Sequence, residues 1–264
     1  MVSRILIIAG SDSGGGAGIQ ADIKTVTCLG GYATTAITAL TAQNTLGVTA
    51  IHELPASFIK AQIDAILEDI GADAIKTGML QNSEVIHAAA DAIEAYDINT
   101  PLIVDPVIQA KGGVALLQPE AVAALKTRLI RRASLITPNI PEAELLSGQT
   151  ISSVDSMKEA GHRLLELGSK AVLIKGGHLH GDTLSDVLVT EHTAHHFTSP
   201  RLNTPHTHGT GCTMASAIAL GIAEGLGLYE AVLLAHNYVH QAILTAPGLG
   251  KGHGPLNHMC NERE

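Results

Sequence analysis

The sequence has few aromatic side chains: Trp is absent, and Phe, Trp and Tyr together make up 2% of the 264 residues. A core with so few rings must be built from Ala, Ile, Leu and Val, which favours close packing of helices on a sheet. Surfaces that bind single-stranded nucleic acid depend on stacking of aromatic rings. The formal net charge of −9 also opposes binding to nucleic-acid backbones and anionic membranes. We therefore expect no nucleic acid and no membrane among the partners.

Cysteine is scarce as well. Cys28, Cys212 and Cys260 lie far apart, and three scattered cysteines fit neither a disulfide framework nor a zinc site. This predicts reduced thiols and a cytoplasmic protein. No apolar run is long enough to span a membrane, and the first ten residues lack the features of a signal peptide. The 14 histidines show no zinc-site spacing, so we expect most of them in loops or on the surface.

Short apolar runs alternate with segments of helical periodicity. The strand candidates are residues 5–9, 36–42, 74–75, 102–104, 135–136 and 171–174. The helix candidates are 17–29, 55–70, 83–96, 119–129, 141–146, 156–167, 212–224 and 229–245. This order predicts an α/β fold, a central and mostly parallel sheet with helices on both faces. Residues 184–190 and 192–198 predict an antiparallel hairpin at one edge. Because no linker or repeat divides the chain, residues 1–264 are predicted to form a single domain.

Polar residues follow the predicted strands. These residues are Asp12, Gln43, Asp105, Asn139 and Lys175. In open α/β sheets, ligands bind beyond the carboxyl ends of the strands. We therefore expect these five side chains to meet at one edge of the sheet.

Residues 208–213, His-Gly-Thr-Gly-Cys-Thr, precede an apolar helix candidate and give the strongest single indication of chemistry. Gly209 and Gly211 allow a sharp turn that points several amides at one spot. The helix start adds unpaired N–H groups and a positive dipole end, which suit a phosphoryl group. The same dipole is expected to lower the pKa of Cys212, so that its thiolate can accept a proton. The alternative is a glycine turn followed by a small buried residue.

Residues 10–18, which include five glycines, follow a strand candidate and open a helix candidate. The segment is neither a Walker A loop nor a dinucleotide fingerprint. Its glycines permit close approach to a flat ligand, and Asp12 is placed to bind a hydroxyl or a ring nitrogen. The alternative is a loop that caps the following helix.

Asn139 and Glu142 are three residues apart at a predicted helix start. A carboxylate there suits Mg²⁺, usually through water, whereas the alternative is an Asn N-cap with a first-turn Glu. Asp105 either reaches a metal or a phosphate, or caps a turn. Lys175 either neutralises phosphate charge or is a surface Lys beside a glycine turn.

Taken together, these segments resemble the bacterial hydroxymethylpyrimidine/phosphomethylpyrimidine kinases of the ribokinase-like superfamily. The resemblance is carried by residues 8–22, 38–45, 76–80, 104–107, 137–143, 175–178, 208–213 and 252–258, and so covers essentially the whole chain. It implies a ribokinase-like three-layer sandwich and usually a homodimer. It also implies ATP-dependent phosphorylation of 4-amino-5-hydroxymethyl-2-methylpyrimidine, and then of its monophosphate, in thiamine synthesis.

The resemblance also implies roles for individual residues. The pyrimidine pocket is Gly10, Asp12, Ala17, Gln43, Met79 and Val107. The residues on the side of Mg²⁺ and ATP are Asp105, Asn139 and Glu142, with Asp105 and Glu142 as the metal residues. The phosphates meet Lys175 and the segment Gly209, Thr210 and Gly211, and Cys212 stands at the position of the catalytic base. Residues 111–113 fall where the family has a mobile flap, and His206 stands where the family pattern has Asn.

Three other functions remain open at this point. Pyridoxal kinase activity within the same superfamily is the closest alternative. A cysteine hydrolase would pair Cys212 with His208 or His206 and needs a third orienting group. A nucleotide sensor would bind ATP without making a product.

Overall fold

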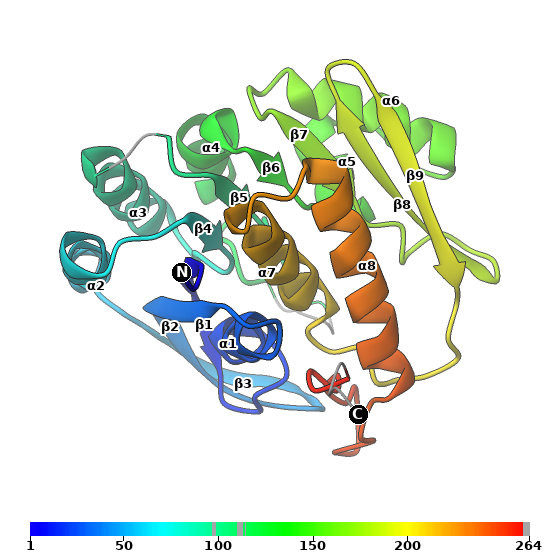
Figure 1. The fold of residues 1–264 in the computed structure, drawn as a ribbon, viewed down its shortest axis with the longest axis horizontal. Helices are drawn as coiled ribbons and strands as arrows, with labels where there is room; N and C mark the ends of the chain where they lie inside the picture. The colour runs from blue at the N-terminus through cyan, green and yellow to red at the C-terminus, as the bar shows by residue number, and fades with distance from the viewer. Residues whose placement is uncertain (97–98, 110–112, 114, 261–264) are drawn as a thin grey trace.

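The computed structural model describes residues 1–96, 99–109, 113 and 115–260. Within these residues the strands form one nine-stranded sheet in the order β3-β2-β1-β4-β5-β6-β7-β8-β9 (Figure 1). The strands are β1 (Arg4–Asp12), β2 (Tyr32–Asn44), β3 (Gly47–Glu53), β4 (Ala74–Thr77), β5 (Leu102–Val104), β6 (Leu135–Ile136), β7 (Ala171–Ile174), β8 (Thr183–Thr190) and β9 (Ala194–Pro200).

The middle of the sheet is parallel and its two edges are antiparallel. The six neighbouring strands β2, β1, β4, β5, β6 and β7 pair in parallel, so their carboxyl ends share one edge of the sheet. β3 runs antiparallel to β2 at one side, and β8 and β9 form an antiparallel hairpin at the other. The predicted parallel centre and edge hairpin are therefore confirmed.

Helices cover both faces of the sheet (Figure 1). One face carries α1 (Gly18–Cys28), α7 (Thr210–Ala223) and α8 (Leu228–Leu244). The other carries α2 (Ala56–Asp69), α3 (Ser83–Tyr96), α4 (Ala121–Ala124), α5 (Ile140–Ser147) and α6 (Val154–Leu165). β1 alternates between them: Leu6 and Ile8 pack toward the second face, and Ile5 and Ile7 toward the first. The result is the expected three-layer α/β sandwich.

The sequence-based prediction differs from the structure most clearly at β1, β2, β3 and the helix predicted at 119–129. β1 was predicted at 5–9 but continues to Asp12, past a bulge between Ala9 and Ser11 that shifts the β1–β2 register, and β2 was predicted at 36–42 but extends over Tyr32–Asn44. β3 has no predicted counterpart, because its residues are mostly exposed and include no apolar run. The helix predicted at 119–129 breaks after α4 into η1, a π-helical turn at Leu125–Leu129, and η2, a 3₁₀ turn at Ile130–Arg132.

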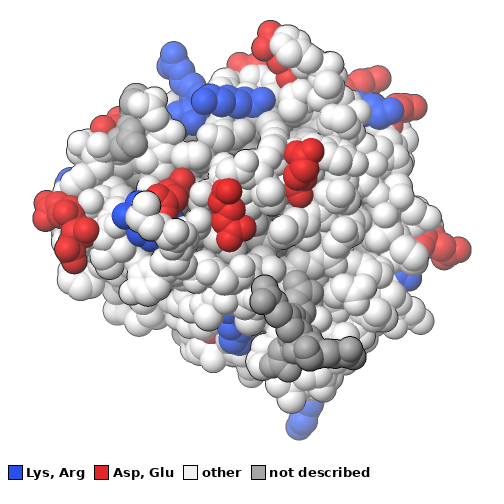
Figure 2. Space-filling model, viewed as in Figure 1, with Lys and Arg blue, Asp and Glu red and all other residues white. Residues whose placement is uncertain are grey.

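The surface has no concentrated charge on the face seen in Figure 2. Lys and Arg side chains are scattered there among Asp and Glu, with uncharged surface between them. Among the described helices, none combines the length and the apolar character that a membrane crossing needs.

Candidate active site

One cavity at the carboxyl edge of the sheet collects every site residue that the sequence predicts. Its lining includes Gly10, Asp12, Ala17, Gln43, Met79, Asp105, Val107, Asn139, Glu142, Lys175, Gly209, Thr210, Gly211 and Cys212. The cavity is also lined by Thr41, Lys76 and His208, for which no role was assigned. The predicted flap at 111–113 falls largely outside the described residues.

The start of α7 presents free amides to this cavity. The first hydrogen bond of the helix runs from the Thr213 amide to the Gly209 carbonyl over 2.9 Å. The amides of Thr210, Gly211 and Cys212 precede that bond and therefore have no acceptor within the helix. With the positive end of the helix dipole behind them, these three groups form an amide nest suited to a phosphoryl group.

Gly209 has to be glycine for two reasons. Its φ is +88°, in the left-handed region. A Cβ atom here would also lie 1.8 Å from the Gly16 carbonyl oxygen, so the two glycine-rich segments pack backbone against backbone. The loop at 10–18 and the amide nest thus form one connected wall of the cavity.

A buried ion pair stands beside the nest. Lys175 Nζ lies 2.9 Å from Asp105 Oδ1, which also accepts a hydrogen bond from the Thr137 hydroxyl over 3.0 Å. A Cβ atom at Gly211 would approach Lys175 Nζ to 3.1 Å, so glycine there leaves room for the ammonium at the helix start. Burial alone would lower the pKa of Lys175, but Asp105 and Glu142 hold it above its usual value. Lys175 therefore stays charged.

Asn139 and Glu142 form a capping box at the start of α5. The Asn139 side chain accepts from the Glu142 amide over 2.9 Å, and Glu142 Oε2 accepts from the Asn139 amide over 2.9 Å. Glu142 Oε1 accepts from the Ile108 amide over 3.1 Å. The helix-cap alternative is thus realised, although both residues line the cavity. Burial raises the pKa of Glu142, against the opposing effect of Lys175.

These contacts argue against a resident Mg²⁺ ion held directly by protein. Asp105 is paired with Lys175, and both Glu142 oxygens already accept from backbone amides. Among the described residues, no group of three His, Cys, Asp or Glu side chains is arranged to hold a metal ion. Mg²⁺ commonly keeps several waters and uses substrate phosphates as ligands, so the donor set suits at most an ion that arrives with a nucleotide.

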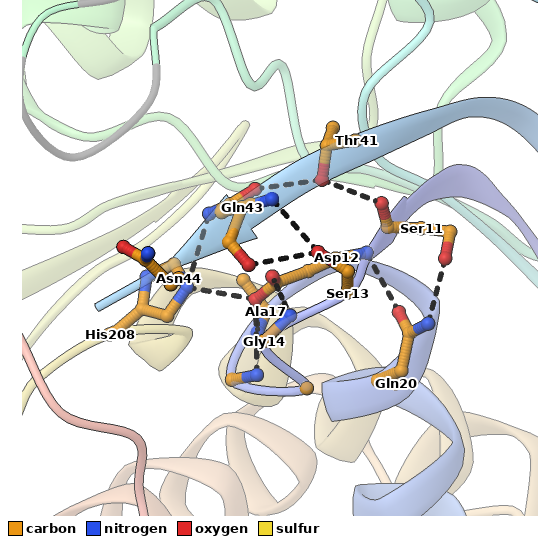
Figure 3. A network of polar contacts seen from close by, with 12 residues as sticks. Ser11, Asp12, Ser13, Gly14, Ala17, Gln20, Thr41, Gln43, Asn44 and His208 are labelled. Atoms are coloured by element: carbon orange, nitrogen blue, oxygen red, sulfur yellow. Dashed lines mark hydrogen bonds and ion pairs between the residues drawn. The ribbon is translucent and has the colours of Figure 1, made fainter. Parts of the chain in front are cut away.

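Asp12 organises the loop that follows β1 (Figure 3). Its Oδ1 accepts from the Gly14 amide over 2.8 Å, and its Oδ2 accepts from the amides of Gly16 and Ala17 over 3.0 and 2.8 Å. His208 Nε2 lies 2.9 Å from the same Oδ2. Burial would raise the pKa of Asp12, but the bonds from His208 and these amides outweigh it and lower the pKa. The carboxylate thus holds the loop in place through amides that precede α1, and no side chain caps the start of that helix by a hydrogen bond.

Gln43 and His208 connect the end of β2 to the amide nest. The two side chains meet at 3.3 Å between their Nε2 atoms, and the Thr41 hydroxyl donates to Gln43 Oε1 over 3.1 Å (Figure 3). His208 thus faces Asp12 and Gln43, whereas a cysteine hydrolase would need it directed at Cys212. Its neighbour His206 has a buried Nδ1 with no hydrogen-bond partner in the described part of the chain.

Met79 and Val107 supply the apolar side of the cavity. Met79 is 7% exposed, and its sulfur would lie 2.9 Å from a Cβ atom at Gly10, so the glycine lets the backbone of β1 approach the thioether. Val107 has φ +43°, which is uncommon for a β-branched residue. Such strained backbone often marks a functional site.

The expected thiolate at Cys212 is wrong for the ligand-free protein. Burial raises the pKa of Cys212 to about 11, against the lowering effects of Lys76 and of the Gly18 amide. The thiol is therefore protonated at neutral pH. The helix start is where it was predicted, but burial in the folded chain outweighs the local dipole.

Lys76 and His208 contribute to the cavity in ways that the sequence did not reveal. Lys76 is fully buried and pairs with Asp22 at 2.9 Å. Nothing in the sequence around Lys76 indicates that this side chain is buried. His208 belongs to the segment that was singled out, but its contacts join residues about two hundred positions apart, which no local pattern reveals.

Known proteins are similar to this chain in sequence and in fold. A family model described as phosphomethylpyrimidine kinase matches residues 12–257. The hydroxymethylpyrimidine/phosphomethylpyrimidine kinase of Bacillus subtilis is 49% identical over 263 residues, covering 99% of this chain and 97% of that protein. The thiamine biosynthesis bifunctional protein ThiED of Geobacter sulfurreducens is 52% identical over 255 residues, and the chain spans 52% of its length.

A solved structure of a neighbouring kinase is also similar. The ADP complex of Bacillus subtilis pyridoxal kinase shares 37% identity with a TM-score of 0.91, over 98% of each chain. The pyrimidine kinases are more similar in sequence than this neighbour, and the family model extends over nearly the entire chain. The protein is therefore a kinase, and it belongs to the phosphomethylpyrimidine kinase family.

Proposed function

We propose that the protein transfers the γ-phosphoryl group of ATP to the hydroxymethyl group of 4-amino-5-hydroxymethyl-2-methylpyrimidine, and a second phosphoryl group to the resulting monophosphate. The observation that carries the proposal is the shared cavity: the amide nest of α7 and the pocket of Gln43, Met79 and Val107 open into the same space. A phosphate bound at the nest and a ring bound in the pocket are therefore within one site.

The pocket side suits a flat aminopyrimidine. Besides its contacts with Thr41 and His208, the Gln43 side chain has a second oxygen lone pair and a second N–H, which match the amino group and the neighbouring ring nitrogen. Met79 and Val107 provide apolar contacts to such a ring. Asp12 acts here by holding Ala17 and the glycine loop in place, since its carboxylate is occupied by backbone amides.

The nest side suits the transferred group. The substrate hydroxyl oxygen attacks the γ-phosphorus, the bond to the bridging oxygen breaks, and ADP leaves with the bonding electrons. The amides of Thr210, Gly211 and Cys212, together with Lys175, offset the negative charge of the migrating group. The hydroxyl proton passes to Cys212 after that thiol, protonated in the ligand-free protein, has released its own proton to solvent. Positioning and charge neutralisation supply most of the rate.

Mg²⁺ is proposed to enter as its ATP complex, where it neutralises phosphate charge. Asp105 and Glu142 interact with it through water, because Asp105 is paired with Lys175 and both Glu142 oxygens accept from backbone amides. We further propose that the protein works as a homodimer in the cytoplasm. Light scattering of the purified protein at assay concentration tests the dimer.

Pyridoxal is the alternative substrate, favoured by the close likeness to a pyridoxal kinase structure. The deciding experiment is product analysis by chromatography with Mg-ATP and, separately, the pyrimidine alcohol, its monophosphate and pyridoxal. We expect mono- and diphosphate products from the two pyrimidines and a lower kcat/KM for pyridoxal. A higher kcat/KM for pyridoxal overturns the proposal, and tight ATP binding without any product indicates a nucleotide sensor.

A matched pair of variants tests the ring pocket in the same assay. Gln43→Leu removes the amide that faces the ring, and we expect kcat/KM for the pyrimidine alcohol to fall about tenfold or more. Gln241→Leu makes the same change on an exposed position of α8 and leaves kcat/KM unchanged. Equal effects of the two variants contradict the assignment of Gln43.

A further inference from the structure

Lys76 is a charged side chain inside the protein core. It lies on β4 with 0% exposure, and its partner Asp22, on α1, is also 0% exposed. The ammonium lies 3.0 and 2.9 Å from the two carboxylate oxygens, and Asp22 Oδ1 also accepts from the Ser216 hydroxyl over 2.7 Å. Removing two charges from water costs several kcal/mol, and such pairs add little to stability over apolar residues of the same size. A role in stability alone therefore accounts poorly for this pair.

The pair is joined to α7 one turn beyond Cys212, through Ser216. Cys212 and Ser216 are one turn apart on α7 and share a face of that helix, as Gly18 and Asp22 do on α1. At the first turns, the Gly18 amide favours the thiolate of Cys212. At the second turns, Ser216 donates to Asp22. Lys76 reaches this junction from the sheet and lines the same cavity as Cys212.

The charges around Cys212 come from four elements. Lys76 from β4 favours the thiolate, as does the Gly18 amide from α1, whereas Asp22 from α1 and Asp105 after β5 oppose it. Lys175 after β7 also interacts with the sulfur. Burial alone would lower the pKa of Lys76, but the Asp22 carboxylate, with Asp105 adding to its effect, holds it above the usual value. Lys76 is therefore a permanent positive charge at this junction.

We propose that Lys76 is a positioning residue of the kinase: its ammonium, held by Asp22 beneath the first turn of α7, controls how readily Cys212 loses its proton. Asp22 acts in the opposite direction, because it shares the ammonium with the sulfur. The inference uses the proposed function only for the role of the thiolate. The ionisation of Cys212 itself can be measured without ATP or pyrimidine.

The test is the rate at which iodoacetamide alkylates Cys212 between about pH 7 and 9, since only the thiolate reacts. The background is Cys28→Ser/Cys260→Ser, which leaves one thiol. Lys76→Met removes the charge at similar volume, and we expect alkylation to slow about tenfold or more at a fixed pH. Asp22→Asn leaves Cys212 as the anionic partner of Lys76, and we expect alkylation to become about tenfold faster. Ser216→Ala removes a hydrogen bond without a charge and is the matched control, with little change.

Opposite shifts in the two charge variants are the signature of the proposal. A purely structural pair predicts loss of stability in both and no opposite change in thiol reactivity. Shifts of the same sign, or none, in variants whose circular dichroism is native overturn the inference. If Lys76→Met alone does not fold, Lys76→Met/Asp22→Asn is compared with Asp22→Asn, and the double variant must react more slowly. If the thiol responds as expected but the pH profile of kcat/KM does not follow it, the inference stands and the proposed role of Cys212 as base fails.

Discussion

Gly209 and Gly177 allow the amide nest to be tested with one and the same substitution. Gly209→Ala places a Cβ atom 1.8 Å from the Gly16 oxygen at φ +88°, whereas a Cβ atom at Gly177 meets nothing within 4 Å. We expect Gly209→Ala to cost at least about 2 kcal/mol of unfolding free energy in urea and to abolish most turnover, because the nest must move. Gly177→Ala should change the unfolding free energy by less than about 0.5 kcal/mol. Similar costs for both variants contradict the packing of the two glycine loops.

The residues around the cavity also show which parts of the site were open to prediction. Asp12, Gln43 and Lys175 could be placed together because each ends a parallel strand, and such ends share an edge of the sheet. The burial of Lys76 could not, because it depends on Asp22, 54 positions away, and through it on α7. Cys212 gave a wrong protonation state for the same reason: the helix dipole is local, whereas its burial is set by the whole fold.

At the scale of elements, the segment that follows α8 is tied to α7 by a neutral histidine. His258 Nε2 lies 3.0 Å from the Thr213 hydroxyl, and the His258 carbonyl accepts from Tyr238 over 2.6 Å. Burial lowers the pKa of His258 to about 4, with Lys24 adding to the effect. The folded pKa is thus below the unfolded value of about 6.5. Between these two values the unfolded chain binds more protons, so His258 contributes stability that is complete above about pH 6.5 and is lost as the pH falls toward 4.

His258→Gln should remove this pH dependence. We expect the unfolding free energy of the wild type to fall by about 2 kcal/mol more than that of His258→Gln between pH 7 and 5. Urea titrations at the two pH values measure the difference. The control is His192→Gln, since the His192 side chain is 82% exposed, and it should follow the wild type. A wild-type pH response in His258→Gln would show that the imidazole is not buried in neutral form.

The burial pattern of each strand or helix decided whether its bounds could be predicted from the sequence. The interior strands β5, β6 and β7 are apolar throughout, and their predicted bounds match the structure. β3 was missed because an edge strand with exposed residues on both faces lacks the alternation that marks a strand. The break after α4 was missed because π-helical and 3₁₀ turns keep the apolar spacing close to that of a regular helix.

At the scale of the whole molecule, both helix layers depend on the same sheet. β1 contributes alternate side chains to the two cores, so neither core can be lost while the other stays packed. We therefore propose that residues 1–264 are a single cooperative domain. Calorimetry should show one transition, with the calorimetric enthalpy equal to the van't Hoff enthalpy. Two resolved transitions would divide the chain into separate units and contradict the single domain.

The backbone contact between Gly16 and Gly209 limits how this catalytic centre can be moved between proteins. A methyl group at Gly209 would clash with the carbonyl oxygen of Gly16, and a methyl group at Gly16 would clash with the imidazole of His208. A chimera that carries only residues 208–213 on another scaffold lacks the loop at 10–18, against which Gly209 packs. Transfer of the phosphate site to another protein therefore requires residues 10–18 and 208–213 together.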